Sequence, residues 1–594
     1  MGQVKEAYEA VLGRVLALRD AESGVWTGEL ASSALGTALA LAALHDSGQP
    51  SDRTLSEAGA KWLAAHANDD GGWGDTPESP SNLSTTLIAA AALRKAEVGG
   101  RRSECLAGAE QWIEGRVGGP ATPESIARAL TAVYGQDRTF AVPILAFLAM
   151  CDAGEQAWRS IPPLPFLLAL LPQGLYRFVR LQVVSYALPA LIAVGLCRHV
   201  CAAHARNRWA WGRLFAAGLL RKLSALQPSH GGFLDAIPLT AFVCLSLRRA
   251  GYGDHAVAQN GLSFLRRSAR ADGSWAIDSN LRTWVTTLAT RALTSGRCRL
   301  APADGERIAA WLVKTQTQAR HPFTGARPGG WAWTDWPGGV PDADDTAGAL
   351  IALRRLKEAG CRTDMSAAVA GGLRWLLALQ NADGGLPTFC RGWGRLPFDR
   401  SSPDISAHAL SALAAWRGEA RQEASSLARA VDRLLAYLGR TQGPDGSWVP
   451  LWFGHQEAER GRNPVVGTAR VVDALRAASR ARLEAPGLEA LLARGERWLL
   501  GAQCADGGWG MGRAATVEET ALAVIALAGG GGSCREAVRR GRAWLAEKSI
   551  DELERAAPIG LYFAVLWYGE RLYPLVWALE ALGLNEENEV NDGR

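Results

Sequence analysis

Residues 329–356 read GGWAWTDWPGGVPDADDTAGALIALRRL and place three carboxylates, Asp342, Asp344 and Asp345, directly before a helical apolar run. An Asp before such a run is an ordinary N-cap, and acidic residues are favoured in the first turn of a helix. Capping explains one Asp well and a second tolerably, but not a third behind a Trp-rich turn. Because like charges this close resist joint ionisation, at least one carboxyl should stay protonated near neutral pH. The stretch therefore predicts a proton-donating carboxylic acid at the mouth of an aromatic cavity, with plain capping as the alternative.

A turn that contains Gln, then Gly, then an aromatic residue recurs along the chain, as in QGPDGSW from Gln442 and QCADGGW from Gln503. In the second half the copies lie roughly 55–62 residues apart, which is enough for two helices each. An amphipathic segment such as GGLRWLLALQ precedes most turns, and a more evenly apolar one such as TAGALIAL follows. This alternation indicates an outer and an inner ring of helices. We therefore predict an all-α fold of two (α/α) barrels, each built from helical hairpins.

Composition excludes several classes of protein. With 594 residues the chain exceeds the usual size of a single core, so two domains are expected. The formal charge of +5 comes without a basic stripe interleaved with aromatics, which argues against a nucleic-acid partner. Ten cysteines occur without CxxC pairs or His partners at zinc spacing, so we expect a reduced cytosolic chain without a metal site. The N-terminal residues lack the apolar core and cleavage site of a signal peptide.

The inner segments can be aligned on their Ala-Leu ends. DDTAGALIAL, DISAHALSAL, WVTTLATRAL and EETALAVIAL then place Asp344, Asp404, Trp284 and Glu518 at one structural position, the N-terminal rim of the inner ring. His408 lies about one helical turn inside this rim. A lone His on an apolar helix face is usually a satisfied core residue. Because it lies in the repeat next to the acid cluster, we expect His408 to pair with the carboxylates.

The stretch from residue 142 to residue 197 departs from the repeat. It contains PPLPFLLALLPQGLYRF and VVSYALPALIAVGL, which are strongly apolar but interrupted by Pro and Arg. Neither segment reaches the roughly 20 apolar residues that a transmembrane helix needs. Two interpretations stay open: a buried helix pair, and a monotopic surface that dips into one leaflet.

These features together resemble one family over nearly the whole chain: the squalene-hopene cyclases and related class II terpene cyclases. The resemblance rests on the repeated turns, GGWAW…PDADDTA, PDISAHAL, LPQGLYRFVRLQVVSYALPAL and IGLYFAVLWYGERLYPLVWAL. It implies a central apolar cavity between the barrels. Residues 1–21 would form a helix that packs with the second barrel, 22–255 the inserted first barrel, and 256–594 the second barrel with the acid. It also implies a linear isoprenoid substrate such as squalene and no metal or organic cofactor. The resemblance further implies monotopic attachment to the cytoplasmic side of the membrane through residues 142–197. It also implies a homodimer.

The family's functional residues can be carried over position by position. Asp344 matches the proton donor, Asp342 and Asp345 its flanking carboxylates, and His408 the partner that raises the donor's acidity. The substrate cavity would be lined by Trp284, Trp333, Phe389 and Trp509, by Leu181 and Ile237 in place of a Trp and a Gln, and by the offset aromatics Tyr562, Trp567 and Tyr568. These departures bear on the substrate and the ring pattern more than on the initiating step.

The residues also suggest the chemistry. Protonating an unactivated alkene needs a carboxyl that is protonated beforehand and whose anion is stabilised afterwards, for which neighbouring carboxylates and a cationic His are suited. Indole faces stabilise carbocations without offering a nucleophile, whereas the tryptophans of the repeated turns are interpreted as packing residues. Three hypotheses follow: a class II cyclase of squalene, a class II cyclase of another polyprenyl chain, and a non-catalytic isoprenoid-binding toroid. An acidic magnesium motif other than Asp-x-Asp-Asp is missing, which argues against a diphosphate-ionising enzyme.

Overall fold

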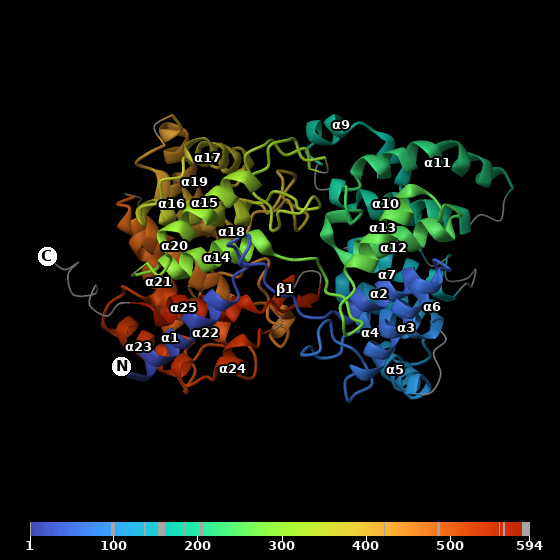
Figure 1. Ribbon diagram of the computed structural model, residues 1–594, viewed down its shortest axis with the longest axis horizontal. Helices are drawn as coiled ribbons and strands as arrows, with labels where there is room; N and C mark the ends of the chain where they lie inside the picture. Colours follow the sequence, from blue (N-terminus) through green and yellow to red (C-terminus); the bar gives the residue numbers. More distant parts are fainter. Residues whose placement is uncertain are drawn as a thin grey trace.

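The computed structural model describes residues 2–584 except 97–100, 136–137, 153–157, 159–160, 182–183, 202–205, 297, 323, 421, 484–486, 558 and 562–564, and gives the backbone alone at 101–103, 138–140, 152, 184–187, 206–214 and 561. The described regular structure is helical except for one antiparallel hairpin, β1 (Ile559–Leu561) and β2 (Leu566–Tyr568). The helices form two bodies that lie side by side (Figure 1). The predicted all-α fold is confirmed.

The first barrel has an inner ring of α2 (Ala34–His45), α4 (Leu83–Lys95), α7 (Arg138–Asp152), α10 (Val184–Cys201) and α12 (Ile237–Arg249). Each of these helices contacts the next, and α12 returns to α2. Around them lie α3 (Pro50–Ala65), α5 (Arg101–Val117), α6 (Pro123–Tyr134), α11 (Arg206–Leu226), α13 (Ala256–Arg267), the short α9 (Gln173–Phe178), and the 3-10 helices η1 (Phe166–Leu170) and η2 (Phe233–Asp235). The inner helices are buried on nearly all sides, which explains their evenly apolar sequences.

The second barrel has an inner ring of α14 (Arg282–Thr294), α16 (Ala343–Glu358), α18 (Pro403–Trp416), α20 (Pro464–Arg480), α22 (Val517–Leu527) and α25 (Leu572–Leu582). These helices again contact one another in sequence order, and α25 closes the ring on α14. The outer helices are α1 (Gly2–Ala17), α15 (Pro302–Thr315), α17 (Ser366–Leu379), α19 (Ala424–Thr441), α21 (Leu488–Gly501) and α23 (Gly532–Ala546); η3 (Glu459–Gly461) and α24 (Ile550–Glu554) lie in connections.

Each repeated turn holds an outer helix to an inner helix of the same barrel. In one turn, buried Trp448 donates its backbone N–H to Thr468 Oγ1 at 3.0 Å and its indole N–H to the Leu438 carbonyl at 2.8 Å. The Gln442 side-chain amide donates to the carbonyls of Gly446 and Leu491. The Trp hydrogen bonds recur at Trp73, Trp275, Trp331 and Trp509. The indole therefore fills the hairpin, and the backbone and indole N–H groups of each of these tryptophans keep an acceptor.

Two such turns explain how one barrel is inserted into the other. Trp26, after α1, donates its backbone N–H to Thr286 Oγ1 on α14, so α1 belongs to the outer ring of the second barrel. Trp275, after α13, donates its backbone N–H to Thr37 Oγ1 on α2, which closes the first barrel on its own first helix. Residues 256–275 therefore pack in the first core, not in the second barrel where the sequence placed them. The boundary predicted after residue 21, between the N-terminal helix and the first barrel, also lies too early in the sequence. Val25 and Trp26 still pack in the core of the second barrel.

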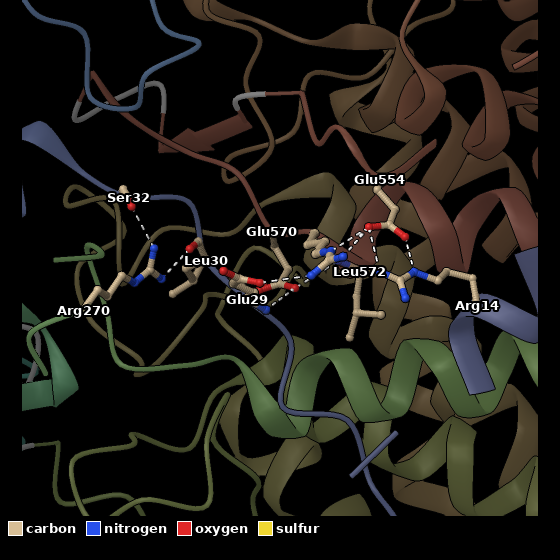
Figure 2. A network of polar contacts seen from close by, with 9 residues as sticks. Arg14, Glu29, Leu30, Ser32, Arg270, Glu554, Glu570 and Leu572 are labelled. Atoms are coloured by element: carbon tan, nitrogen blue, oxygen red, sulfur yellow. Dashed lines mark hydrogen bonds and ion pairs between the residues drawn. The ribbon is translucent and has the colours of Figure 1, made fainter. Parts of the chain in front are cut away.

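A network of charged groups joins the barrels (Figure 2). The buried Glu570 carboxylate accepts the backbone N–H groups of Glu29 and Leu572, each at 3.0 Å, and burial raises its pKa to about 7. Gly28 has a φ of 72°, and a Cβ there would lie 2.6 Å from Glu570 Oε1, so the linker needs glycine at this point. Arg270 reaches across from the first barrel to the Leu30 carbonyl at 2.5 Å.

The apolar stretch 142–197 divides into buried and exposed parts. Side chains of α7 and α10, such as Phe147 and Ile192, lie in the first core, as the buried-pair interpretation expects. Between these helices, η1 and α9 are exposed; α9 lies at the top edge of Figure 1. The exposed apolar side chains there, together with two from the second barrel, form the apolar patch: Leu167, Leu168, Leu170, Leu171, Leu175, Phe178, Val179, Trp393 and Leu396. Among the described residues, no helix has the length and hydropathy to cross a membrane.

Candidate active site

The inner helices of the second barrel carry polar groups toward a common interior. A small cavity of about 50 Å³ lies inside this ring and is lined by residues of all six helices: Trp284, Thr287, Leu288, Arg291, Gly348, Ile351, His408, Ser411, Ala469, Arg470, Asp473, Leu522, Ile525, Trp577 and Glu580. Their spacing of three or four residues on each helix fits one inward face. The helix N-termini lie at one rim of this interior, where the positive ends of the dipoles favour carboxylates.

The three carboxylates of the acid cluster have different environments. Asp342 is the N-cap of α16, because its side chain accepts the backbone N–H groups of Asp344 and Asp345, both at 2.9 Å. Asp345 is buried beside it and has one carboxylate oxygen without a hydrogen-bond partner. Asp344 instead points to other helices. Capping therefore accounts for Asp342 alone.

Asp344 lies between two basic side chains. Its Oδ1 is 2.6 Å from Nδ1 of His408 on α18, and its Oδ2 is 3.2 Å from Nη1 of Arg470 on α20. The expected pairing of His408 with the carboxylates is confirmed as a contact. Burial by itself would raise the pKa of Asp344, but Arg470 and His408 outweigh burial and hold it below its usual range.

The flanking carboxyls shift in the opposite direction. Burial raises the pKa of Asp342 to about 7, and burial together with the neighbouring carboxylates raises that of Asp345 well above its usual value. The proton that the sequence places in this cluster therefore resides on the flanking pair in the resting state, whereas Asp344 favours its anion. Such an anion is the conjugate base of an unusually strong carboxylic acid.

Arg470 is a site residue that the sequence analysis missed. Its guanidinium lies 4.3 Å from the ring centroid of Phe453 and 5.5 Å from that of Trp284, so its charge is held between two aromatic faces and Asp344. A signal existed in the sequence: aligning VVGTARVVDAL of α20 on its Ala-Leu end places Arg470 in register with His408.

Several predicted aromatics do gather near the acid cluster. Trp284 lies on α14 and its ring is 5.8 Å from that of His408. The ring centroids of Trp333 and Phe389 are 6.2 Å apart, and those of Phe389 and Trp452 are 5.9 Å apart. The strand-like segment before Phe389 touches the acid motif, since the Ala343 N–H donates to the Thr388 carbonyl at 2.8 Å. The predicted lining role of these residues stays a prediction.

The structure corrects the assignment of Trp509. Its backbone N–H bonds to Thr520 Oγ1 and its indole N–H to the Leu499 carbonyl, with the ring fully buried. Trp509 is therefore a hairpin-packing residue like Trp448. Its sequence context, QCADGGWG, already matched the turn pattern.

The remaining predicted lining residues come from the first barrel and from the C-terminal segment of the chain. Ile237 is buried at the start of α12, in the first core. Leu181 follows α9, partly exposed, and its N–H donates to the Tyr176 carbonyl at 2.7 Å. The Trp567 N–H donates to Asp75 of the first barrel at 2.7 Å. Tyr568 lies against Tyr573 on α25, and burial raises its pKa to about 12. Tyr562 lies outside the described residues.

Comparisons with known proteins agree with this architecture. The family models for the squalene-hopene cyclase N-terminal and C-terminal domains match residues 12–201 and 280–554. A probable squalene–hopene cyclase of Sinorhizobium fredii is 24% identical over an alignment of 657 positions, which covers 95% of this chain and 94% of that protein. An ent-copalyl diphosphate synthase of a Streptomyces species is 33% identical over 248 residues, 41% of this chain and 40% of that protein. The structure of ent-copalyl diphosphate synthase from Streptomyces platensis has a TM-score of 0.58 at 22% identity, covering 98% of this chain and 99% of that one.

Two barrels with an Asp-x-Asp-Asp motif at the rim of the second define a class II terpene cyclase, an enzyme that starts cyclisation of a polyprenyl chain by protonating it. The chain belongs to the squalene-hopene cyclase family.

Proposed function

We propose that Asp344 protonates the terminal alkene of a linear isoprenoid, with squalene as the favoured substrate. The observation that carries the proposal is the position of its carboxylate between His408 and Arg470. The charge of Arg470 and the hydrogen bond with His408 stabilise the conjugate base, so each proton transferred from Asp344 to carbon leaves a stable anion. Every unit by which they lower the pKa corresponds to about 1.4 kcal/mol of differential stabilisation between the two protonation states.

The aromatic side chains next to the acid suit the cations that follow. Trp333, Phe389 and Trp452 surround the entry to α16, and each ring face can stabilise a nearby positive charge by about 0.5–2 kcal/mol without reacting with it. Carbocations also require that water be kept away. We infer that the folded polyprene lies between the barrels, against these rings.

A second substrate class is a polyprenyl diphosphate. It is favoured by the ent-copalyl diphosphate synthase relative, whose identity to this chain exceeds that of the squalene–hopene relative, although over a shorter segment. The similarity to the squalene–hopene relative extends over 95% of this chain, and this supports squalene as the substrate.

The test is to treat purified protein with EDTA, incubate it with squalene and with geranylgeranyl diphosphate, and identify products by mass spectrometry. We expect a cyclic product from squalene without added metal. Among the described residues no three or more His, Cys, Asp or Glu side chains are grouped to hold a metal. Activity that appears only when magnesium or zinc is restored would contradict this chemistry, and products from the diphosphate alone would assign the second substrate class.

Leu181 is expected to influence the product. A Trp at this position would present a large rigid face to the substrate, whereas Leu offers neither the bulk nor the quadrupole. We therefore expect Leu181→Trp to change the product ratio from squalene while leaving initiation intact. The products of the two proteins would be compared by gas chromatography with mass spectrometry. Identical products in identical ratios would remove Leu181 from the selectivity determinants.

We further propose that the apolar patch binds the membrane surface on the cytoplasmic side. Phe178 is 84% exposed and Trp393 57% exposed, which is unusual for large apolar side chains. Residues 161–181 contain Arg177 and Arg180 but no Asp or Glu, so the patch also suits anionic lipid headgroups. Trp393 donates its indole N–H to the Val179 carbonyl at 2.8 Å, which joins the two barrels at this surface. A homodimer stays a prediction.

The double substitution Leu168→Glu and Phe178→Glu is expected to abolish co-sedimentation with vesicles of anionic and zwitterionic lipid. Two charges would have to enter the apolar part of the bilayer. Val133→Glu is the matched control, because Val133 is 43% exposed on α6 and lies outside the patch. Equal vesicle binding by the double variant and the parent would refute the membrane proposal.

A further inference from the structure

The antiparallel hairpin of β1 and β2 lies between the two barrels (Figure 1). Successive side chains of a strand point to opposite faces. On β2, Trp567 is buried on one face, whereas Leu566 and Tyr568 on the other face keep partial exposure. The hairpin therefore carries Tyr568 on its more open side, between the barrels where we place the folded polyprene.

A short series of contacts leads from Tyr568 to the proposed acid. The ring centroids of Tyr568 and Tyr573 are 6.5 Å apart, and those of Tyr573 and Phe453 are 6.2 Å apart. Phe453 lies under the guanidinium of Arg470, which pairs with Asp344. Burial raises the pKa of Tyr568, and the charges of Arg470 and Asp344 also act on it, in opposite directions. A shift of β2 would therefore displace an aromatic ring in the neighbourhood of the acid.

Buried carboxyl groups hold the hairpin and its flanks at three points. Glu518 of α22 accepts the Ala557 N–H, before β1, at 2.8 Å. Glu570, after β2, accepts the Leu572 N–H at 3.0 Å. Both of these carboxyl groups belong to the second barrel. The third is Asp75, which belongs to the first barrel and reaches β2 itself.

Asp75 lies in the turn that follows Trp73 and is only 1% exposed. Its Oδ2 accepts the backbone N–H of Trp567 at 2.7 Å, across 492 positions of sequence. Its Oδ1 accepts the side-chain amide of Asn82 at 2.9 Å and the hydroxyl of Thr85. The loss of this acceptor would leave a buried N–H without its partner, a cost that the strand can escape only by moving.

We propose that Asp75 is a positioning residue of the cyclase: from the first barrel it fixes the place of β2, and thereby the place of Tyr568 against the cyclising chain. It acts through the strand and not on the reacting atoms. A strand that is free to shift would let the polyprene fold in other ways after it has been protonated, so Asp75 governs which product forms more than how fast the reaction starts. This inference rests on the function proposed for Asp344.

The proposal is tested by removing the bond to the hairpin and, separately, another bond of the same carboxylate. Asp75→Ala removes the acceptor of the Trp567 N–H. Thr85→Val has nearly the same shape as the parent side chain and is the matched control, because it removes a hydrogen bond to Oδ1 and leaves the one between Oδ2 and Trp567 in place.

A rescue variant exchanges two side chains of the turn. In Asp75→Asn combined with Asn82→Asp, the new amide donates its N–H to the new carboxylate, which orients its oxygen toward the Trp567 N–H. Asp at residue 82 can still accept the Thr85 N–H and cap α4, as Asn82 does. The exchange therefore restores the bond to β2 with a different chemical group.

Each protein is incubated with squalene and with geranylgeranyl diphosphate, and products and residual substrate are quantified by mass spectrometry. We expect Asp75→Ala to raise the share of products other than the parent's main product at least about threefold, while substrate consumption stays within about fivefold of the parent. Thr85→Val and the exchanged pair should keep the parental product shares. Hydrogen exchange of residues 566–572 should be faster in Asp75→Ala than in Thr85→Val.

Parental product shares in folded Asp75→Ala, or an equal change in Thr85→Val or in the exchanged pair, would overturn the positioning role. If Asp75→Ala does not fold, Asp75→Ser, whose side chain ends one atom short of the Trp567 N–H, is read in the same way. Failure of the parent itself to form product from either substrate would instead refute the proposed function, and the positioning role with it.

Discussion

Asp344→Asn is expected to abolish cyclisation, with a loss of kcat on the order of 10²–10⁴-fold or more, because an amide cannot donate a proton in place of the carboxylic acid. The variant should remain folded, since the Asn oxygen can still accept from Arg470 and its NH2 group can donate to Nδ1 of His408 when that nitrogen carries no proton. Conversion of substrate would be followed by mass spectrometry, and folding by near-UV circular dichroism.

Glu518→Gln is the matched control for this substitution. Glu518 occupies the equivalent rim position on α22, and burial raises its pKa to about 8, so it is already largely neutral at pH 7. Its Oε1 accepts the Ala557 N–H at 2.8 Å, which a Gln oxygen can do as well. We expect this variant to keep most of its activity. Near-parental activity in folded Asp344→Asn would remove Asp344 from the donor role.

Arg470→Met is expected to lower the maximal rate by about 10²-fold and to move the alkaline limb of the pH–rate profile to higher pH. Arg470 lowers the pKa of Asp344, so its loss raises that pKa. The carboxyl then stays protonated to higher pH, but it is a weaker acid and transfers its proton more slowly.

The measurement is kcat/KM from about pH 3 to pH 9, a range that extends below the usual carboxyl pKa, because the pKa of Asp344 in the parent is lowered. Arg470→Lys keeps a positive charge and should restore part of the rate and of the pH dependence, although it loses the planar contact with the Phe453 ring. A limb that stays in place in Arg470→Met, or that moves to lower pH, would show that Arg470 does not set the acidity of Asp344.

The barrels and the acid cluster could be predicted because both depend on local pattern. Trp-bearing turns and the change from amphipathic to apolar helices identify each hairpin, and three adjacent carboxylates at a helix start are visible without any tertiary information. The contact between Asp344 and His408 also followed from aligning equivalent inner segments, since equivalent residues of a ring face the same interior.

The errors arose where distant segments decide the outcome. Trp509 has the sequence of a turn, and only its hydrogen bonds to Thr520 and Leu499 separate packing from substrate contact. Residues 256–275 belong to the first barrel because Trp275 bonds to Thr37, a partner more than two hundred residues away. Arg470 pairs with Asp344 across the ring, and an Arg in an apolar segment does not indicate its counterion by itself.

The central claim, that a proton from Asp344 starts the reaction, is tested most directly by incubating the enzyme with squalene in D₂O and locating deuterium in the product. The account predicts one non-exchangeable deuterium per molecule, at the carbon of the terminal alkene that accepts the proton, and no labelled product from Asp344→Asn. A cyclic product without solvent deuterium, or equal labelling by Asp344→Asn, would contradict it.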